Sequence, residues 1–405
     1  MLSKPGRTGA DKGFDDDGKT NRFLAKRTRN TAKNLVRGLR CWYIPYLKSR
    51  YYSDRFRPLL SYLFTDWKCN VNCWYCFTWN NKVKGMTPET ARKSIDWLRT
   101  VGCRVVALMG GEPLLRKKFI LDVIKYGSDR DFFMYLPTNG ILMDRDFIER
   151  AGEAGVAAIN LAVDKIKEAP GLPKSFERVK TNFKHLVRLR EKYGYIIFFN
   201  INITSENIED VKELTRIARD HDIGTDYHMN EHPVIEQKHY KYLEQGFWIS
   251  DEHFRKTDEL IDWLVERNLE GWPMVNSAEH LRAMKSFVRG KGGPWDCRAG
   301  INSLVIRLDG TLAPCFELYS TEKDWGRVWE PAFDHARLRE MKKECNPKCL
   351  STCNYQVYHY YNTYSRGLEW VLKHIHRGFS REEDGRRKAA DADGKGKGKS
   401  EEARA

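Results

Sequence analysis

The sequence predicts an α/β fold in which helices cover a parallel sheet. Short apolar runs alternate in the middle of the chain with amphipathic segments of helical period, a pattern typical of repeated strand–helix units. Glycine or polar residues directly follow several of these runs. Because ligands of such folds bind at the carboxyl ends of the strands, these residues are candidates for a site. The 405 residues suffice for one large domain and a smaller one.

The expected elements follow from local sequence. Thr87 and Pro88 begin a helix that reaches about Thr100, with proline at its first position as helices prefer. Residues 105–109 (Val-Val-Ala-Leu-Met) predict a buried strand. The other expected strands span residues 61–64, 132–136, 157–163, 196–203 and 225–229, and further helices span about 175–192 and 207–220.

Three cysteines follow the first strand at the spacing C-x3-C-x2-C, namely Cys69, Cys73 and Cys76. Three thiolates this close can hold three irons of a [4Fe–4S] cluster, and no fourth cysteine lies near enough in sequence to complete the set. Ferredoxin-type clusters have four cysteine ligands and carry electrons. A cluster that lacks one protein ligand has an open iron, which predicts a catalytic site. The alternative is zinc, which usually takes four ligands from paired C-x2-C knuckles.

This spacing resembles the signature of the radical S-adenosylmethionine (SAM) enzymes, C-x3-C-x-aromatic-C, with Tyr75 as the aromatic residue. The resemblance implies that SAM binds the open iron and is cleaved to a 5′-deoxyadenosyl radical, which takes hydrogen from the substrate. It implies a partial (β/α)6 TIM-like barrel, with which the expected strands are compatible. It also implies an electron donor such as flavodoxin or ferredoxin. The cofactor carries the difficult chemistry, and the protein orients it.

A Gly-Gly-Glu-Pro segment, residues 110–113, directly follows the buried strand at 105–109. The family carries a similar motif at this place, so the resemblance implies that Gly110, Gly111 and Glu112 contact the SAM amino group. Glycine allows a ligand to approach the backbone closely, and a carboxylate near an ammonium group favours both charged forms. A simple turn is the alternative.

Polar residues at later strand ends are further candidates. By resemblance, Asp164 after the fourth strand and Asn200 and Asn202 on the fifth are candidates to contact the SAM ribose and carboxylate. Asn139 and Thr138 are expected to line the same pocket. A turn or strand-end cap is the alternative for each of them. No catalytic residue beyond the cluster ligands is assigned.

A second group of five cysteines lies between residues 297 and 353. Its members are Cys297, Cys315, Cys345, Cys349 and Cys353, the last three at the spacing C-x3-C-x3-C. Asp309-Gly310 predicts a hairpin between residues 303–308 and 311–314, which brings Cys297 toward Cys315. Five cysteines in so short a stretch predict a metal site.

This region resembles the auxiliary-cluster extension of radical SAM enzymes called SPASM, or Twitch in its shorter form. Cys297, Gly310 and Cys315 match the opening of that pattern, whereas the later cysteines depart from it in number and spacing. We therefore expect one auxiliary [4Fe–4S] cluster, held by Cys297, Cys315 and two or three later cysteines, in a small cysteine-rich α+β domain. A structural zinc site is the alternative.

Charge and composition divide the chain into four parts. Residues 1–57 carry fifteen Lys and Arg and five Asp and Glu, which gives +10 of the net charge of +15. We expect a basic, partly disordered arm over 1–57, the radical SAM core over 58–289 and the auxiliary-cluster domain over 290–360. A C-terminal helix and a disordered charged tail are expected over 361–405.

The basic arm is expected to form a helix from about Arg22, with Leu35, Leu39 and Trp42 on one side, that ends at Pro45. Three functions are compatible with it. It can be a solvated extension, or contact an anionic membrane through its cations and the aromatic cluster around Trp42, or bind RNA. No RNA-binding motif is visible, so no nucleic-acid partner is expected.

The remaining composition bears on compartment and activity. The sequence lacks a long apolar run and a secretory signal, and its cysteines have metal-type spacings, which predicts a cytoplasmic protein, at most peripheral to the membrane. By resemblance, the leading hypothesis is a radical SAM enzyme that modifies a peptide or protein. Modification of a lipid or other small molecule is the second hypothesis. A non-catalytic iron–sulfur or zinc protein that binds RNA is the third.

Overall fold

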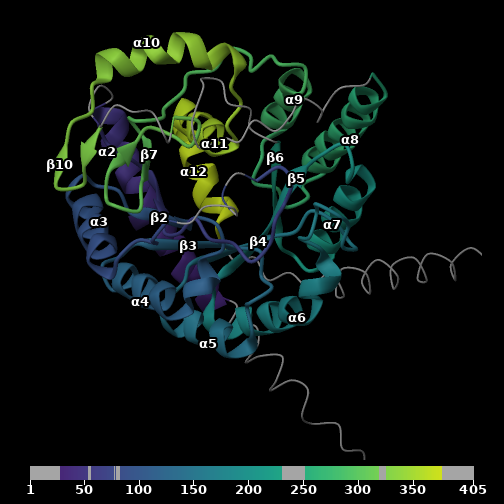
Figure 1. Cartoon of the computed structure of the whole chain (residues 1–405), viewed down its shortest axis with the longest axis horizontal. Coiled ribbons are helices and arrows are strands. Elements are labelled where there is room, and N and C mark those ends of the chain that lie inside the picture. Colours follow the sequence, from purple (N-terminus) through teal and green to yellow (C-terminus); the bar gives the residue numbers. More distant parts are fainter. Residues whose placement is uncertain are drawn as a thin grey trace, which may run out of the picture.

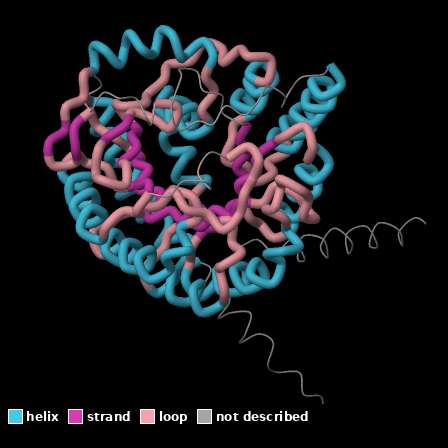
Figure 2. The backbone as a smooth tube through the Cα atoms, in the orientation of Figure 1, coloured by secondary structure: helices cyan, strands magenta, loops and turns pink. Residues whose placement is uncertain are grey.

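The computed structural model of the chain describes residues 28–52, 56–76, 78, 83–229, 251–318 and 325–375. A curved sheet lines the inside of the molecule and helices surround it (Figures 1 and 2). The segments expected to be disordered, the first twenty residues and the tail from Arg377, lie outside the described residues. No helix among those described is long and apolar enough to cross a membrane.

Six parallel strands in chain order form most of the sheet. They are β1 (Leu60–Phe64), β2 (Val105–Met109), β3 (Phe133–Thr138), β4 (Ala158–Ala162), β5 (Ile196–Ile203) and β6 (Gly224–Met229), each paired with the next. The helices between and after them are α3 (Pro88–Thr100), α4 (Lys117–Ser128), α5 (Arg145–Glu153), α6 (Phe176–Tyr193), α7 (Ile208–Asp220), α8 (Asp251–Leu269) and α9 (Ala278–Phe287). The predicted strand–helix units are confirmed.

The hairpin predicted around Gly310 is present but belongs to this same sheet. β7 (Ser303–Ile306) pairs antiparallel with β8 (Leu312–Ala313), and on its other side β7 pairs in parallel with β1. The sheet runs from β6 through β1 to β8 without closing, as a partial barrel requires. The boundary expected at residue 290 therefore does not separate two sheets. The division into functional domains stays a prediction.

The extension after the hairpin is largely helical. It contains β9 (Gly326–Arg327), β10 (Glu330–Pro331), α10 (His335–Cys345), α11 (Thr352–Asn362) and α12 (Tyr364–Lys373). Buried residues at the amino ends of the strands, such as Phe133 and Ile196, share one apolar cluster with Trp370 of α12 and Trp42 of the N-terminal arm. The last helix and the arm thus cover the end of the barrel opposite to the carboxyl ends of its strands.

The expected end of the arm helix at Pro45 is wrong. Residues 28–51, here called the arm helix, continue through a π-helical turn over Leu39–Tyr43 into α2 (Ile44–Tyr51). Pro45 directly follows the π-helical turn, in which the Ile44 amide donates to the Leu39 carbonyl five residues back, and this wider turn accommodates the proline without ending the helix. Leu35 is exposed and does not share the buried side of Trp42.

Two aromatic residues of the cluster expected at a membrane interface, Trp42 and Tyr46, are buried in protein. Trp42 stacks on Trp370 with ring centroids 4.6 Å apart and donates to the Gly367 carbonyl over 3.0 Å. The Tyr46 hydroxyl donates to the Thr363 carbonyl over 2.8 Å. Trp42 and Tyr46 are both fully buried. Trp42 and Tyr46 therefore anchor the arm helix to α12 and do not face lipid, whereas Ile44 and Leu47 beside them are exposed. Membrane contact by the rest of the arm stays a prediction.

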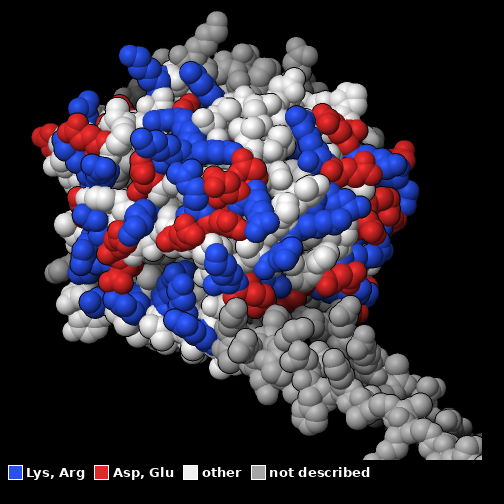
Figure 3. Space-filling view, turned by 90° about the horizontal axis from the view of Figure 1, so that it is seen from below, with Lys and Arg blue, Asp and Glu red and all other residues white. Residues whose placement is uncertain are grey.

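The surface charge is mixed on the outer helices. Figure 3 shows basic and acidic side chains interspersed over the face seen from below in Figure 1. Many form pairs about one helical turn apart, such as Lys125 of α4 with Asp129 directly after that helix, and Arg145 with Glu149 in α5. Such exposed pairs contribute little stability, but they prevent a uniform positive field over this face.

His374, just after α12, is buried as a neutral ring. Its Nδ1 lies 2.7 Å from the Trp370 carbonyl oxygen, to which it can only donate. Its Nε2 lies 3.0 Å from the Tyr135 hydroxyl and accepts from it. Both nitrogens are therefore satisfied without a second proton. Burial lowers the pKa of His374 to about 3.

We expect the free energy of unfolding to fall as the pH drops from about 6.5 toward 3, since the unfolded chain then binds a proton that the folded chain does not. At pH 5 the loss from His374 alone is about 2 kcal/mol. Urea unfolding between pH 7 and 5 measures it. The variant His374→Phe cannot titrate here and should show a flatter pH dependence. Equal slopes for the two proteins would contradict the prediction.

Candidate functional site

The three cysteines and the Gly-Gly-Glu segment meet at the carboxyl end of the sheet. The cysteine loop, residues 65–76, follows β1, and the glycines follow β2, its neighbour. One cavity of about 180 Å³ is lined by Cys69, Cys73, Cys76, Gly110, Gly111, Glu112, Thr138, Asn139, Lys174 and Asn200, among others. The structure therefore places the two motifs side by side.

The two glycines are required by the cysteine loop itself. The Gly111 amide donates to the Asp66 carbonyl, and the Glu112 amide donates to the Lys68 carbonyl, each over 2.8 Å. A Cβ on Gly111 would lie 2.1 Å from the Lys68 carbonyl oxygen, and one on Gly110 would lie 2.4 Å from that of Asp66. Only glycine allows this approach. Packing against the cysteine loop thus explains why both positions are glycine. The contact of this segment with SAM stays a prediction.

The substitution Gly111→Ala should therefore displace the cysteine loop. We expect it to cost about 3 kcal/mol of unfolding free energy, because the atoms in the way belong to the backbone. Chemical denaturation measures the loss. Gly271→Ala is the control, because Gly271 has a φ of +85° but open space around it, so it reports backbone strain of about 1 kcal/mol alone. Equal losses for both variants would exclude the clash.

Glu112 is buried, and most of its acceptor capacity is used within the protein. Its Oε1 accepts from the Leu114 amide over 2.9 Å and from the Thr138 hydroxyl over 2.7 Å. Its Oε2 accepts from the Asn139 amide over 2.8 Å. A carboxylate has about four acceptor positions, so one remains on Oε2. Burial raises the pKa of Glu112, and the three hydrogen bonds oppose that shift.

Asp164 is fully buried at the end of β4 and holds several neighbours in place. It accepts from the Tyr75 hydroxyl, from the Asn202 amide over 2.9 Å, and pairs with the Lys174 ammonium over 3.2 Å. Asp164 is not among the residues that line either cavity at this end of the sheet. The expected contact of Asp164 with SAM remains untested, while its contacts with the protein are established.

A second cavity of about 230 Å³ adjoins the first. Its lining includes Tyr75, Cys76, Lys174, Asn200, Asn202, His228, Phe316 and Cys353. Cys76, Lys174 and Asn200 line both cavities. Asn202 and Tyr75 thus face the second cavity, whereas Glu112 faces the first.

Lys174 and His228 are the site residues that the sequence did not indicate. Lys174 lies between β4 and α6 outside any motif. Burial opposes its charge, but Asp164 and then Cys73 and Cys76 raise the pKa of Lys174 above its usual value. It is therefore a fixed cation facing both cavities. His228 contacts Asn200 over 3.3 Å and Asp226 over 3.3 Å.

The thiols of the core site suit a cationic centre. Burial raises the pKa of Cys69 to about 12 and that of Cys73 to about 11, and neighbouring thiols act in the same direction. A bound metal reverses this cost, because coordination deprotonates a thiol. Among the residues described, no three Cys, His, Asp or Glu side chains converge closely enough for a single ion. The C-x3-C-x2-C spacing in the sequence is the observation that favours a [4Fe–4S] cluster over zinc at this site.

The second group of cysteines is divided between two places. Cys297, Cys315, Cys345 and Cys349 are buried. Burial raises the pKa of Cys315, and Glu317, Cys297, Cys349 and Cys345 raise it further, so these groups lie within electrostatic reach of Cys315. Cys353 instead lines the second cavity beside Phe316.

Glu317 is a further residue that the sequence did not indicate. Its side chain is buried, and neither carboxylate oxygen has a hydrogen-bond partner within the described part of the chain. A buried carboxylate without a partner costs free energy. A cluster or zinc ion held by four thiolates would be negative overall, so Glu317 does not by itself favour a metal centre there.

Comparisons with known proteins identify the domain that contains the core cysteines. Residues 68–223 match the family model of the Radical SAM superfamily. The AdoMet-dependent heme synthase of Methanosarcina barkeri is 26% identical over 38% of this chain and 44% of its own length. This chain thus spans less than half of that relative. The probable GTP 3′,8-cyclase of Methanocaldococcus jannaschii is 27% identical over 61% of this chain and 81% of its own length.

Solved structures share the fold. SuiB of Streptococcus suis, bound to the precursor peptide SuiA, superimposes with a TM-score of 0.56 at 14% identity over 86% of this chain and 79% of its own. The enzyme anSMEcpe, with AdoMet and the Cp18Cys peptide, gives a TM-score of 0.52 at 18% identity over 78% and 99%. With the cysteine motif and the open parallel sheet, the family match shows that residues 68–223 of this chain form a radical SAM domain.

Proposed function

We propose that this protein modifies a peptide or protein by radical chemistry that starts from SAM. The observation that carries this proposal is the second cavity, which is built from both halves of the chain. Tyr75 and Cys76 of the cysteine loop line it on one side, and Phe316 and Cys353 of the extension line it on the other. A substrate held between them would lie next to the core cysteines. The peptides bound in the SuiB and anSMEcpe structures support this substrate class.

The core residues fit the cofactors of the family. Cys69, Cys73 and Cys76 would hold a [4Fe–4S] cluster. When bound, the cluster and SAM supply an electron and a 5′-deoxyadenosyl radical, which takes a hydrogen atom from the substrate. The electron would come from a flavodoxin or ferredoxin.

Two charged side chains would orient SAM. We assign its carboxylate to Lys174, whose ammonium group faces both cavities. We assign its amino group to Glu112, whose Oε2 has an acceptor position left. Asp164 pairs with Lys174 and accepts a hydrogen bond from Tyr75, so it holds both side chains in place. In this proposal Asp164 positions SAM through Lys174 and does not contact SAM itself.

We further propose that Cys297, Cys315, Cys345 and Cys349 hold one auxiliary [4Fe–4S] cluster, and that Cys353 is not a ligand but lines the second cavity, where the substrate would lie. Iron and zinc analysis of anaerobically purified protein tests this assignment. Two clusters correspond to about eight irons per chain. Cys315→Ser should lose about half of them, and Cys353→Ser none. One equivalent of zinc in place of the auxiliary iron would contradict the proposal.

The substrate class is tested with reconstituted protein, SAM and dithionite under anaerobic conditions. Short peptides encoded beside this gene are incubated in one arm and GTP in the other. GTP is included because GTP 3′,8-cyclases are among the relatives by sequence, which makes a small molecule the second candidate. A mass change in a peptide, together with release of 5′-deoxyadenosine, supports the proposal. Modification of GTP and of no peptide would overturn it.

A further inference from the structure

A third cavity lies at the end of the barrel opposite to the cysteine loop. It is a cavity of about 490 Å³ between the arm helix and the turn that precedes β3. Its lining is formed by Arg29, Ala32, Lys33, Val36, Arg37, Arg40 and Cys41 on the helix and by Ser128, Asp131 and Phe132 on the barrel. A ligand here cannot be the molecule that reacts at the cysteine loop, because the sheet separates the two sites.

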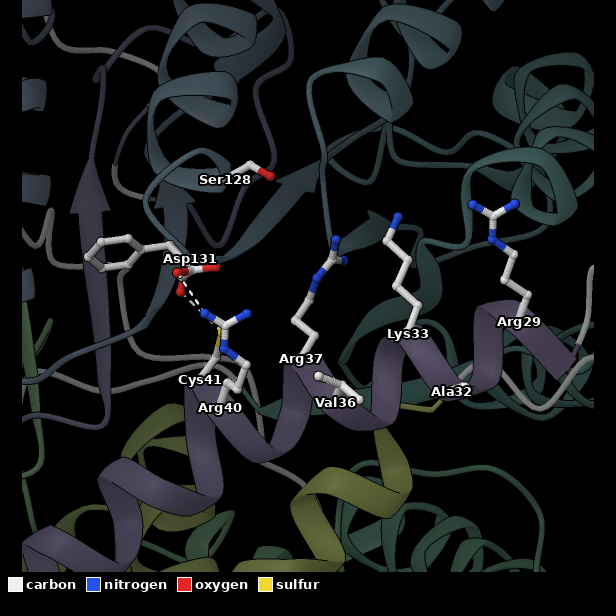
Figure 4. Close-up of a pocket in the computed structure, with 10 residues that line it drawn as sticks. Arg29, Ala32, Lys33, Val36, Arg37, Arg40, Cys41, Ser128 and Asp131 are labelled. Atoms are coloured by element: carbon white, nitrogen blue, oxygen red, sulfur yellow. Dashed lines mark hydrogen bonds and ion pairs between the residues drawn. The ribbon is translucent and has the colours of Figure 1, made fainter.

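Four cations of the arm helix point into this cavity from the same side. Figure 4 shows Arg29, Lys33, Arg37 and Arg40 extended toward the barrel. The first three are spaced four residues apart, so their row is roughly 12 Å long with roughly 6 Å between neighbours.

Only one of these cations is neutralised. Arg40 pairs with Asp131 over 2.8 Å. Among the described residues, no carboxylate forms an ion pair with Arg29, Lys33 or Arg37, and the Lys33 ammonium reaches only the Tyr193 carbonyl at 3.5 Å. Burial lowers the pKa of Lys33, and repulsion from Arg37 and Arg29 lowers it further. The three charges therefore repel one another without an anion between them.

The other ionisable group that the described lining contains, Cys41, does not offset the charge of Arg29, Lys33 and Arg37. Burial raises the pKa of Cys41 to about 11, so its thiol is neutral near pH 7. Arginine forks match phosphate oxygens in pairs, and lysine adds a point charge. Ala32 and Val36 give the cavity an apolar part as well. The lining thus suits a molecule with a multiply charged phosphate end and an organic remainder.

We propose that this cavity binds an organic diphosphate or triphosphate, either a soluble nucleotide or the headgroup of a multiply phosphorylated lipid. A single-stranded nucleic acid is disfavoured, since such polymers stack their bases on exposed aromatic rings. Phe132, the aromatic residue in this lining, is 2% exposed. The volume lies within the range of about 300–1,000 Å³ typical of small-ligand pockets.

The test is calorimetric titration of the full-length protein with inorganic triphosphate, which carries the proposed charge without an organic part. We expect saturable binding. Lys33→Gln and Arg37→Gln should each weaken it about tenfold or more. Lys48→Gln is the matched control, because Lys48 lies on the same helix outside the cavity and should leave the affinity unchanged. Absence of binding, or equal weakening by all three variants, would overturn the proposal.

Asp131→Asn gives a result that misfolding cannot imitate. Asp131 has a φ of +63°, which asparagine tolerates well. Removing its carboxylate frees Arg40 and should tighten triphosphate binding about twofold to fivefold. Unchanged or weaker binding would count against the site.

Two further arms identify the source of the phosphate. Phosphatidylcholine vesicles with and without a bisphosphorylated inositol lipid are compared with ATP as the soluble ligand. The proposal is supported if the protein binds the phosphorylated lipid or ATP, if triphosphate competes with that binding, and if Arg37→Gln weakens it. The ligand that binds identifies the source of the phosphate. Vesicle or single-stranded RNA binding that triphosphate does not displace would overturn it, because the phosphate chain would then not be what the cavity recognises.

Discussion

Replacing Cys76 by alanine is expected to abolish SAM cleavage. Cys76 is one of three cysteines around the first cavity and also lines the second. With two thiolates left, the core cluster loses the ligand nearest to the proposed substrate position. Release of 5′-deoxyadenosine by reconstituted protein with SAM and dithionite should fall to background. Iron analysis should show the loss of about four irons per chain.

The matched control for this experiment is Cys103→Ala. Cys103 is also fully buried, but it lies before β2, and its thiol donates to the Val105 carbonyl over 3.4 Å. It lines neither cavity. Its variant should cleave SAM like the wild type. If iron-loaded wild-type protein released no 5′-deoxyadenosine, the radical mechanism would be wrong for this chain whatever the variants do.

Asp164→Ala is expected to destabilise the protein by about 3–5 kcal/mol. The substitution leaves the ammonium of Lys174 without its counter-ion, and the Lys174 side chain is only 16% exposed. It also removes the acceptor of the Tyr75 hydroxyl and of the Asn202 amide. Urea unfolding of the protein without SAM measures the effect. A residue whose task was solely to contact SAM would not change stability in that experiment.

Two comparisons make this prediction specific. Asp220→Ala breaks an exposed pair with Arg219 and should cost less than about 1 kcal/mol. In the double variant Asp164→Ala/Lys174→Met no buried charge is left unpaired, so the combined loss should be smaller than the sum of the single losses. Additive losses would show that the two side chains act independently.

The strands could be predicted from the sequence because each is a short apolar run with polar or glycine residues at its ends. Val105–Met109 and Ile196–Ile203 were predicted with the ends that they have. The pairing of β7 with β1 was not predicted, since the apolar run at 303–306 reads the same whether its free side faces solvent or another strand. The helix end at Pro45 was wrongly placed because a π-helical turn just before the proline accommodates it, and the sequence gives no sign of that turn.

The sequence predicts those site residues that lie close together in one motif. It does not predict those that come together only in the folded chain. Cys69, Cys73 and Cys76 form one loop, and their spacing alone carries the signal. Lys174 and Glu317 stand in no motif, and their meaning depends on which distant groups surround them. In the second cysteine group the spacing could not show that Cys353 faces the other cavity.

The continuous sheet has a consequence for any attempt to shorten this protein. β1, which leads into the cysteine loop, has β2 on one flank and β7 on the other. A chain cut before residue 290 would leave the β7 flank of β1 bare, with its backbone amide and carbonyl groups open to pairing with another molecule. Bare strands of this kind are templates for aggregation. The barrel half should thus be insoluble when expressed alone, even though it contains every residue that the family signature demands.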